Sequence, residues 1–154
     1  MRSEARANAL VLAGSAALLG GALLSQFVGG LFPCEMCYWQ RWPHLAAIAL
    51  GLLAWAMGSN RALTALAAIA VLVSGAIGVF HAGVEYHWWE GVTTCTATPV
   101  TGSASEVLGS IMATPLIRCD AAQWTLFGIS LAGYNAILSG LIGGGALWLL
   151  RKPR

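Results

Sequence analysis

Four long apolar stretches, separated by short polar segments, form the dominant pattern of the chain. None of them contains an acidic residue, a lysine or an arginine; they are Ala9–Leu31, Pro43–Gly58, Ala62–Val84 and Trp124–Leu150. About 20 helical residues, each rising about 1.5 Å, cross a bilayer core of about 30 Å. The pattern therefore predicts an all-α membrane protein built as a four-helix transmembrane bundle.

The second stretch is too short to cross a bilayer comfortably unless its helix begins upstream, near residue 40. Pro43 then either lies inside this helix or opens it after a break. The first stretch is longer than the roughly 7 to 15 apolar residues of a signal peptide, and no convincing A-x-A site follows it, so we expect a retained span. We thus predict one domain over residues 1–154, with spans at about 9–31, 40–58, 62–84 and 124–150.

The composition points to lipid as the main surroundings of this protein. Hydrophobic residues form 58% of the chain and charged residues only 9%, whereas about 25% of the residues in a soluble domain are charged. The 19 glycines cluster inside the apolar runs, as at Gly20-Gly21, Gly29-Gly30 and the run Gly140-Leu-Ile-Gly-Gly144, and we expect them to let helices pack closely. A soluble globular protein is disfavoured, and no nucleic-acid partner is expected.

The placement of positive charge predicts the orientation in the membrane. Of the eight Lys and Arg residues, only Arg41 and Arg118 fall in the segments 32–42 and 85–123. The other basic residues lie on the opposite side of the bundle: Arg2, Arg6, Arg61, Arg151, Lys152 and Arg154. Because cytoplasmic loops carry the excess of Lys and Arg, we expect both termini in the cytoplasm and both segments outside.

All four cysteines, Cys34, Cys37, Cys95 and Cys119, lie in these two outward segments. They therefore face the oxidising side of the membrane, where disulfides persist. A bond between Cys95 and Cys119 could be a structural staple or an exchange-active bond, and the spacing alone favours neither.

The second outward segment also contains features of a membrane surface. Tyr86, Trp88 and Trp89 are aromatic residues of the kind that lie at headgroup level. Further on, Ser103 and Glu106 have capping-box spacing and precede apolar residues at helical intervals. We predict a short interfacial amphipathic helix here.

The Cys34-x-x-Cys37 spacing suits half of a zinc site, a haem attachment or a redox-active dithiol. Tyr38, not histidine, follows, which argues against haem. Cys95 and Cys119 do not repeat the spacing, which argues against zinc, and no metal is expected. A redox role has a physical basis, because cysteines at a helix N-terminus or near a cation ionise more readily and the thiolate is the nucleophile in exchange.

Arg41 lies four residues after Cys37, on the same face of a helix. Its guanidinium is expected to stabilise a Cys37 thiolate or a nearby anionic oxygen, although a boundary arginine can also simply reach lipid headgroups. His87, beside the interfacial tryptophans, is expected to face the same pocket as Arg41. His44 and His81 are expected to pack or to contact headgroups.

Taken together, these residues resemble the DsbB family of quinone-linked, disulfide-forming membrane proteins. The resemblance covers essentially the whole chain: four spans, "CEMCYWQR" at the start of the second, two cysteines in the second outward loop, and "QWTLFGISLAGYN" opening the last span. It implies a protein-disulfide oxidoreductase of the bacterial inner membrane. Such an enzyme reoxidises a periplasmic thioredoxin-like oxidase of the DsbA kind and passes the electrons to a membrane quinone, ubiquinone or menaquinone.

The resemblance also implies a role for each cysteine. The thiolate of the partner oxidase would attack Cys95 and form a mixed disulfide. Cys119, once released, would exchange with the Cys34–Cys37 bond by bonding to Cys34. Cys37 would then remain as a thiolate beside the quinone.

Two further residues are implied in quinone binding. Arg41 matches the family arginine associated with the quinone, and His87 falls near a histidine also implicated there. The segment between the two loop cysteines differs in sequence from the best-known members, which leaves the identity of the partner oxidase open.

Two other interpretations remain. A vitamin K epoxide reductase-like protein also combines four spans, quinone-type chemistry and two cysteine pairs, but its C-x-x-C adjoins the last span, whereas here it precedes the second. A non-enzymatic membrane scaffold with structural disulfides would make Arg41 and the C-x-x-C dispensable.

Overall fold

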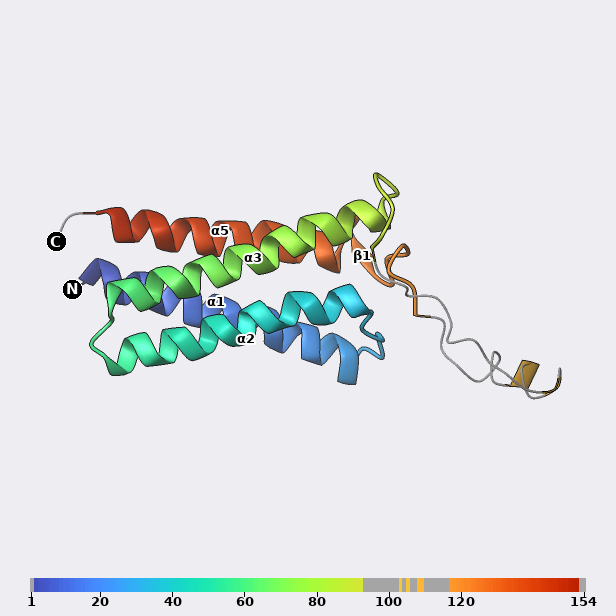
Figure 1. Cartoon of the computed structure of the whole chain (residues 1–154), viewed down its shortest axis with the longest axis horizontal. Coiled ribbons are helices and arrows are strands. Elements are labelled where there is room, and N and C mark those ends of the chain that lie inside the picture. The colour runs from blue at the N-terminus through green and yellow to red at the C-terminus, as the bar shows by residue number, and fades with distance from the viewer. Residues whose placement is uncertain (1, 93–102, 104, 106–107, 110–116, 153–154) are drawn as a thin grey trace.

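The computed structural model describes residues 2–92, 103, 105, 108–109 and 117–152. Within these residues, four long helices lie side by side as one bundle (Figure 1): α1 (Arg2–Phe27), α2 (Glu35–Ala56), α3 (Arg61–Glu85) and α5 (Leu131–Arg151). The start of α1 and the end of α5 lie at one end of the bundle, called the terminal end below. The start of α2 and the end of α3 lie at the other end, called the cysteine end because it holds Cys34 and Cys37.

Three of the described helices are long and apolar enough to cross a membrane: Ser3–Phe27, Arg61–Glu85 and Leu131–Arg151. The all-α membrane architecture predicted from the sequence is confirmed to that extent. Helix α2 has 22 residues, but its first half carries Gln40, Arg41 and His44, and it is not among the three. Its role as the second span stays a prediction.

Helix α2 begins directly at the C-x-x-C motif. Cys34 is the N-cap residue, and its Sγ accepts a hydrogen bond of 3.3 Å from the backbone N–H of Cys37. Pro43 lies inside the helix and does not open it. A proline inside a helix removes one backbone donor and disturbs the preceding turn; there the Ser74 hydroxyl of α3 donates to the carbonyl of Gln40 at 2.8 Å.

The sequence pattern predicted a helix from Trp124 onward, but the first residues of the last apolar stretch are not helical. Instead, β1 (Thr125–Leu126) and β2 (Ile129–Ser130) form a short antiparallel hairpin. Phe127 and Gly128 between them have φ values of 51° and 76°, as a two-residue type I′ turn requires. The Ser130 hydroxyl then accepts from the backbone N–H of Gly133, so α5 begins only at Leu131.

Glycines do allow close approach of the helices, among them Gly143 of the run 140–144, as expected from the sequence. A Cβ atom at Gly78 of α3 would lie 3.0 Å from the Ala132 carbonyl oxygen, and one at Gly143 of α5 would lie 2.6 Å from Leu72 Cγ. Around Gly20, Gly21 and Gly140, by contrast, a Cβ would meet nothing within 4 Å. Because the atoms met at Gly78 and Gly143 include backbone carbonyls, the backbones of α3 and α5 approach each other closely.

The core at the terminal end consists of small aliphatic side chains from all four helices. These residues are Ala7, Val11, Ala47, Ala67, Ala68, Val71, Ala146 and Leu150. At the cysteine end, a second buried cluster contains two cysteines, Cys34 and Cys119. The amphipathic helix predicted after Ser103 falls largely outside the described residues, as does Cys95.

Candidate redox site

Cys34 and Cys37 are free thiols in direct contact. Their Sγ atoms lie 3.0 Å apart, compared with about 2.05 Å in a disulfide bond. Cys34 is buried, whereas Cys37 is partly exposed. The pKa of the Cys34 thiol is raised, first by its hydrogen bond to Cys37 and second by burial. Cys34 is therefore the thiol that keeps its proton while the pair is reduced.

Cys119 reaches the same place from the segment before the hairpin. It is disulfide-bonded, and it is buried in one cluster with Cys34, Met36 and Val84, against which Cys37 also packs. The structure thus brings together three of the four cysteines that the sequence analysis singled out, and the fourth, Cys95, is outside the described residues. Packing of Cys119 with Cys34 is the arrangement that thiol exchange between the two segments needs.

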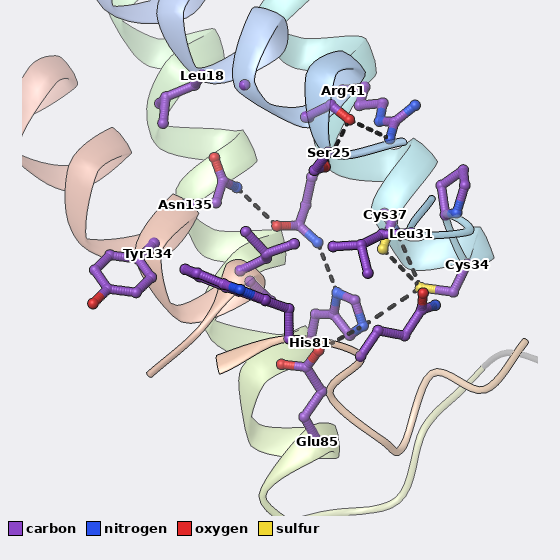
Figure 2. Close-up of a pocket in the computed structure, with 18 of the residues that line it drawn as sticks. Leu18, Ser25, Leu31, Cys34, Cys37, Arg41, His81, Glu85, Tyr134 and Asn135 are labelled. Carbon is purple, nitrogen blue, oxygen red and sulfur yellow. Dashed lines mark hydrogen bonds and ion pairs between the residues drawn. The ribbon is translucent and has the colours of Figure 1, made fainter. Parts of the chain in front are cut away.

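A cavity of about 400 Å³ opens beside the dithiol (Figure 2). Its walls come from all four long helices and from residues 118–126. Apolar side chains such as Leu18 of α1 and Leu138 of α5 form one part of the lining. Cys34, Cys37 and Arg41 belong to the polar part.

Arg41 is held at this cavity by helix α1. Its Nη1 donates to Gln26 Oε1 at 2.6 Å, and its Nη2 donates to the Ala22 carbonyl at 3.2 Å. The guanidinium carbon also lies 5.2 Å from the centre of the Tyr38 ring. Because a guanidinium carries five N–H donors, these contacts fix its position and leave donors for a ligand.

A chain of hydrogen-bonded polar side chains runs through the bundle beside the cavity. His44 Nε2 lies 3.0 Å from Asn135 Oδ1, Asn135 Nδ2 donates to Gln40 Oε1 at 2.8 Å, and Gln40 Nε2 lies 2.8 Å from His81 Nδ1. The chain ends at the dithiol, where His81 Nε2 lies 3.5 Å from Cys34 Sγ. The sequence analysis missed this chain, although polar residues inside apolar runs were its available signal.

The structure places His87 away from Arg41, contrary to the expectation that both face one pocket. His87 lines a different hollow, together with Val84, Trp88 and Asp120. The cause is the backbone: α3 ends at Glu85, and His87 adopts a φ of 58° as the chain turns out of the helix. The histidines that line the Arg41 cavity are His44 and His81.

Cys34, Cys37 and His81 also offer three possible metal ligands whose atoms lie within 4.8 Å of one another. Two sulfurs bound to a tetrahedral zinc ion at about 2.3 Å would lie about 3.8 Å apart. The observed separation of 3.0 Å is shorter. The contact therefore suits closure of a disulfide better than a metal site.

An exposed ion pair lies next to Cys119. Arg118 Nη2 and Nε donate to the two carboxylate oxygens of Asp120 at 2.6 and 2.8 Å. The hydrogen bonds from Arg118 lower the pKa of Asp120 to about 2, and the same pairing raises the pKa of Arg118. Arg118 also lines the cavity, so this pair holds a fixed cation at its outer rim.

The hairpin is tied to the end of α3 by one side chain. The Tyr86 hydroxyl donates to the Gly128 carbonyl at 2.9 Å and accepts from the Ser130 N–H at 2.9 Å. Gln123 adds a hydrogen bond of 2.5 Å to the carbonyl of Phe32. The segment 123–130 is thereby held at both of its ends against the cysteine end of the bundle.

Comparison with known proteins gives a consistent result. The family model "Disulfide bond formation protein DsbB" matches residues 4–149. A Disulfide bond formation protein B from Polaromonas naphthalenivorans is 30% identical, over 96% of this chain and 91% of the relative. Another from Verminephrobacter eiseniae is 28% identical, over 92% of this chain and 83% of the relative.

A third relative of the same name, from Azoarcus, is 29% identical over 91% of this chain. No solved structure matches the chain significantly. The family match covers nearly all of the described helices, including the dithiol, Arg41 and the hairpin. The chain therefore belongs to the DsbB family of disulfide bond formation proteins.

Proposed function

We propose that this protein reoxidises a periplasmic dithiol oxidase of the DsbA kind and passes the electrons to a membrane quinone. The observation that carries the proposal is the contact of the Cys34–Cys37 dithiol, at 3.0 Å, with both a cavity of about 400 Å³ and the buried Cys119. A donor of electrons and a space for an acceptor meet there. Family membership supports a disulfide oxidoreductase.

The proposed route is a series of thiol–disulfide exchange steps. The partner's thiolate attacks Cys95, whose bond to Cys119 breaks and leaves Cys119 as a thiolate. Cys119 then attacks Cys34 Sγ of the Cys34–Cys37 disulfide, and the electron pair of that bond remains on Cys37. A second partner thiolate releases the oxidised partner and frees Cys95 as a thiolate. Cys95 then attacks Cys119 of the Cys34–Cys119 bond, which re-forms the Cys95–Cys119 disulfide and leaves Cys34 reduced, so that two electrons have entered the Cys34–Cys37 pair.

A quinone suits the cavity in size and in chemistry. Sites for small molecules typically occupy about 300–1,000 Å³ and combine apolar walls with a few polar groups, and this cavity has about 400 Å³. His44 lines it, and His44 Nδ1 is buried without a hydrogen-bond partner among the described residues. A bound quinone supplies an acceptor for two electrons and two protons.

Arg41 and His44 would hold the two states of this acceptor. The unused N–H donors of Arg41 suit a carbonyl oxygen or the negative charge that develops on it. The free Nδ1 of His44 is a lone-pair acceptor and suits a hydroxyl group. Leu18 and Leu138 offer an apolar wall toward α1 and α5 for the rest of the molecule.

The orientation in the membrane forms part of the proposal. The start of α1, the end of α5 and the turn between α2 and α3 lie at the terminal end (Figure 1), where Arg61 and Arg151 are also located. We place this end in the cytoplasm because positive charge accumulates on that side. The cysteine end then faces the periplasm.

The test is a turnover assay with purified protein, a reduced thioredoxin-like partner and added quinone. We expect oxidation of the partner to be matched by reduction of the quinone, and Cys37→Ala to abolish both. When mixed with the oxidised, disulfide form of the partner, Cys119→Ser is expected to form a mixed disulfide between Cys95 and the partner, because the free Cys95 thiolate attacks the partner's disulfide. This product is visible as a covalent complex on a non-reducing gel.

Three outcomes would contradict the proposal. Normal quinone reduction by Cys37→Ala would remove the dithiol from the electron path. Capture of the partner on Cys34, with Cys95 untouched, would reverse the order of the two pairs. Wild-type protein that shows no turnover while its Cys37→Ala and Arg41→Met variants fold normally would favour a membrane scaffold.

A further inference from the structure

His81 lies against the dithiol in a position that the exchange chemistry does not yet use. Its side chain is 2% exposed, and two acceptors lie near its Nε2. Cys34 Sγ is 3.5 Å away, Glu85 Oε1 is 3.7 Å away, and the backbone of Cys119 also forms a hydrogen bond with the ring. Whether His81 donates to the sulfur or accepts from it depends on which ring nitrogen carries the proton.

The hydrogen-bond chain behind His81 decides this question, because two backbone carbonyls fix its direction. Gln40 Nε2 lies 3.2 Å from the Met36 carbonyl, and Asn135 Nδ2 lies 3.1 Å from the Ser74 carbonyl. A carbonyl oxygen can only accept, so rotating either amide by half a turn would place two oxygens against each other. Both amides therefore keep their NH₂ groups where the structure has them.

This orientation determines the proton on the imidazole. Gln40 Nε2, an N–H donor, lies 2.8 Å from His81 Nδ1, so Nδ1 must be the acceptor. In a neutral imidazole the other nitrogen then carries the hydrogen. Nε2–H is directed to the side where Cys34 Sγ lies.

We propose that His81 is a catalytic hydrogen-bond donor to Cys34, held in its Nε2–H tautomer by Gln40, and that it favours the Cys34 thiolate during reoxidation of the dithiol. This role rests on the proposed function. When the pair is oxidised, Cys34 and Cys37 form one S–S bond, two electrons pass to the quinone, and the two thiol protons are matched by the two taken up in the quinol. His81 keeps its own proton throughout.

The physical basis is the growth of negative charge on Cys34 Sγ. While the pair is reduced, Cys34 holds its proton because its thiol is hydrogen-bonded to Cys37. Once the Cys37 sulfur has reacted with the electron acceptor, the hydrogen bond between Cys34 and Cys37 is lost, whereas the hydrogen bond from His81 remains. Hydrogen bonds to a charged acceptor are stronger than those to a neutral one, so the His81 bond favours loss of the proton.

Several titratable groups surround the Cys34 thiol from the elements packed against it. On α2 these are Cys37, Arg41 and His44; on α3 they are His81 and Glu85; on the following segment and α5 they are Arg118 and Tyr134. Glu85 opposes a thiolate, whereas Arg41 and Arg118 favour one. The test must therefore isolate the contribution of His81.

The experiment follows the Cβ chemical shift of ¹³C-labelled Cys34 against pH in detergent-solubilised Cys37→Ala protein, without quinone. We expect His81→Phe to raise the titration midpoint by about one pH unit or more, because one hydrogen bond to a charged group is lost. His81→Gln, whose amide can again donate toward the sulfur, should recover part of this shift. His44→Phe is the matched control, because His44 lies at the far end of the same hydrogen-bond chain, where its Nε2 bonds to Asn135.

An unchanged midpoint in His81→Phe, an equal shift in His44→Phe, or a His81→Gln titration identical to that of His81→Phe would overturn the inference. The unsubstituted protein offers an independent measurement that does not depend on folding of a variant. Long-range ¹H–¹⁵N spectra of His81 should show the Nε2–H tautomer, and the Nδ1–H tautomer would refute it. If His81→Phe shifts the titration but protein with all four cysteines cannot reduce quinone, the proposed function is overturned and the hydrogen bond stands.

Discussion

The two ends of the bundle are built from the same four helices but solve different problems. At the terminal end, Ala, Val and Leu side chains from every helix form one tightly packed cluster. At the cysteine end, the helices separate around a cavity of about 400 Å³, and buried polar groups such as Gln40, His81 and Ser130 replace aliphatic ones. One end holds the helices together, and the other holds a reactive pair of sulfurs.

The cysteine end shows how polar groups can be buried without loss of the fold. A buried amide or imidazole is costly unless it is hydrogen-bonded. Gln40 and Asn135 meet this condition through three helices, with partners on α2, α3 and α5. Close packing of α3 on α5 at Gly143 keeps these partners in register from the other end.

Arg41→Met should have the largest effect, because it removes a charge at the cysteine end and leaves the packing of the terminal end unchanged. We expect the KM for quinone to rise about ten- to a hundredfold, as for loss of a hydrogen bond to a charged or polarised group. The unfolding midpoint of the bundle should change little. Steady-state kinetics with varied quinone measures the first effect, and Arg61→Met at the terminal end is the control. An unchanged KM would exclude Arg41 from the quinone site.

Gly143→Val should produce the opposite pattern. A new Cβ would lie 2.6 Å from Leu72 Cγ and 2.9 Å from the Ala68 carbonyl, and overpacking of this kind typically costs about 1–3 kcal/mol. We expect a lower free energy of unfolding in detergent with unchanged quinone reduction per folded molecule. Gly144→Val, where a Cβ meets nothing within 4 Å, should be close to neutral. Equal destabilisation by both variants would show that the α3–α5 contact is not the cause.

The smallest effect is expected from pH at the rim of the cysteine end. Arg118 depresses the pKa of Asp120 to about 2, so the pair contributes stability above the ordinary carboxyl pKa of about 3.9. This contribution is lost as the pH falls through about 2, and it is small because both side chains are exposed. The carboxyl ¹³C shift of Asp120 measures the titration, which Arg118→Gln should move back toward the ordinary range. A titration that does not respond to this change would show that Arg118 is not the cause.

The sequence was sufficient for the parts of the site that depend on chain order. The C-x-x-C spacing, its position beside an apolar run and the following Arg41 are local patterns, and the structure places Cys37 and Arg41 on one cavity. Helix existence was equally predictable from the long apolar runs, which is why α1, α3 and α5 were expected. The start of α5 was not, because the Phe127-Gly128 turn lies inside an apolar run that carries no charge.

The polar chain could not be predicted from the sequence, because it depends on how the helices rotate against each other. Gln40, His81 and Asn135 lie on three helices and are separated by 41 and more positions along the chain. Their identity as polar residues in apolar runs is visible in the sequence, but their partners are not. For the same reason His87 was wrongly expected to face the pocket of Arg41. It is close to the cysteine loop in sequence but lines another hollow.

The direction of the hydrogen bonds from His44 to Cys34 has an electrostatic consequence. Each N–H dipole in this chain points toward the sulfur, and dipoles aligned head to tail polarise one another. Helix α2, which begins at Glu35, directs the positive end of its own macrodipole at the same atom. Cys34 therefore lies in a field produced by fixed, buried partial charges. Mobile salt ions screen such a field only weakly, so the readiness of this sulfur to become a thiolate should depend little on ionic strength.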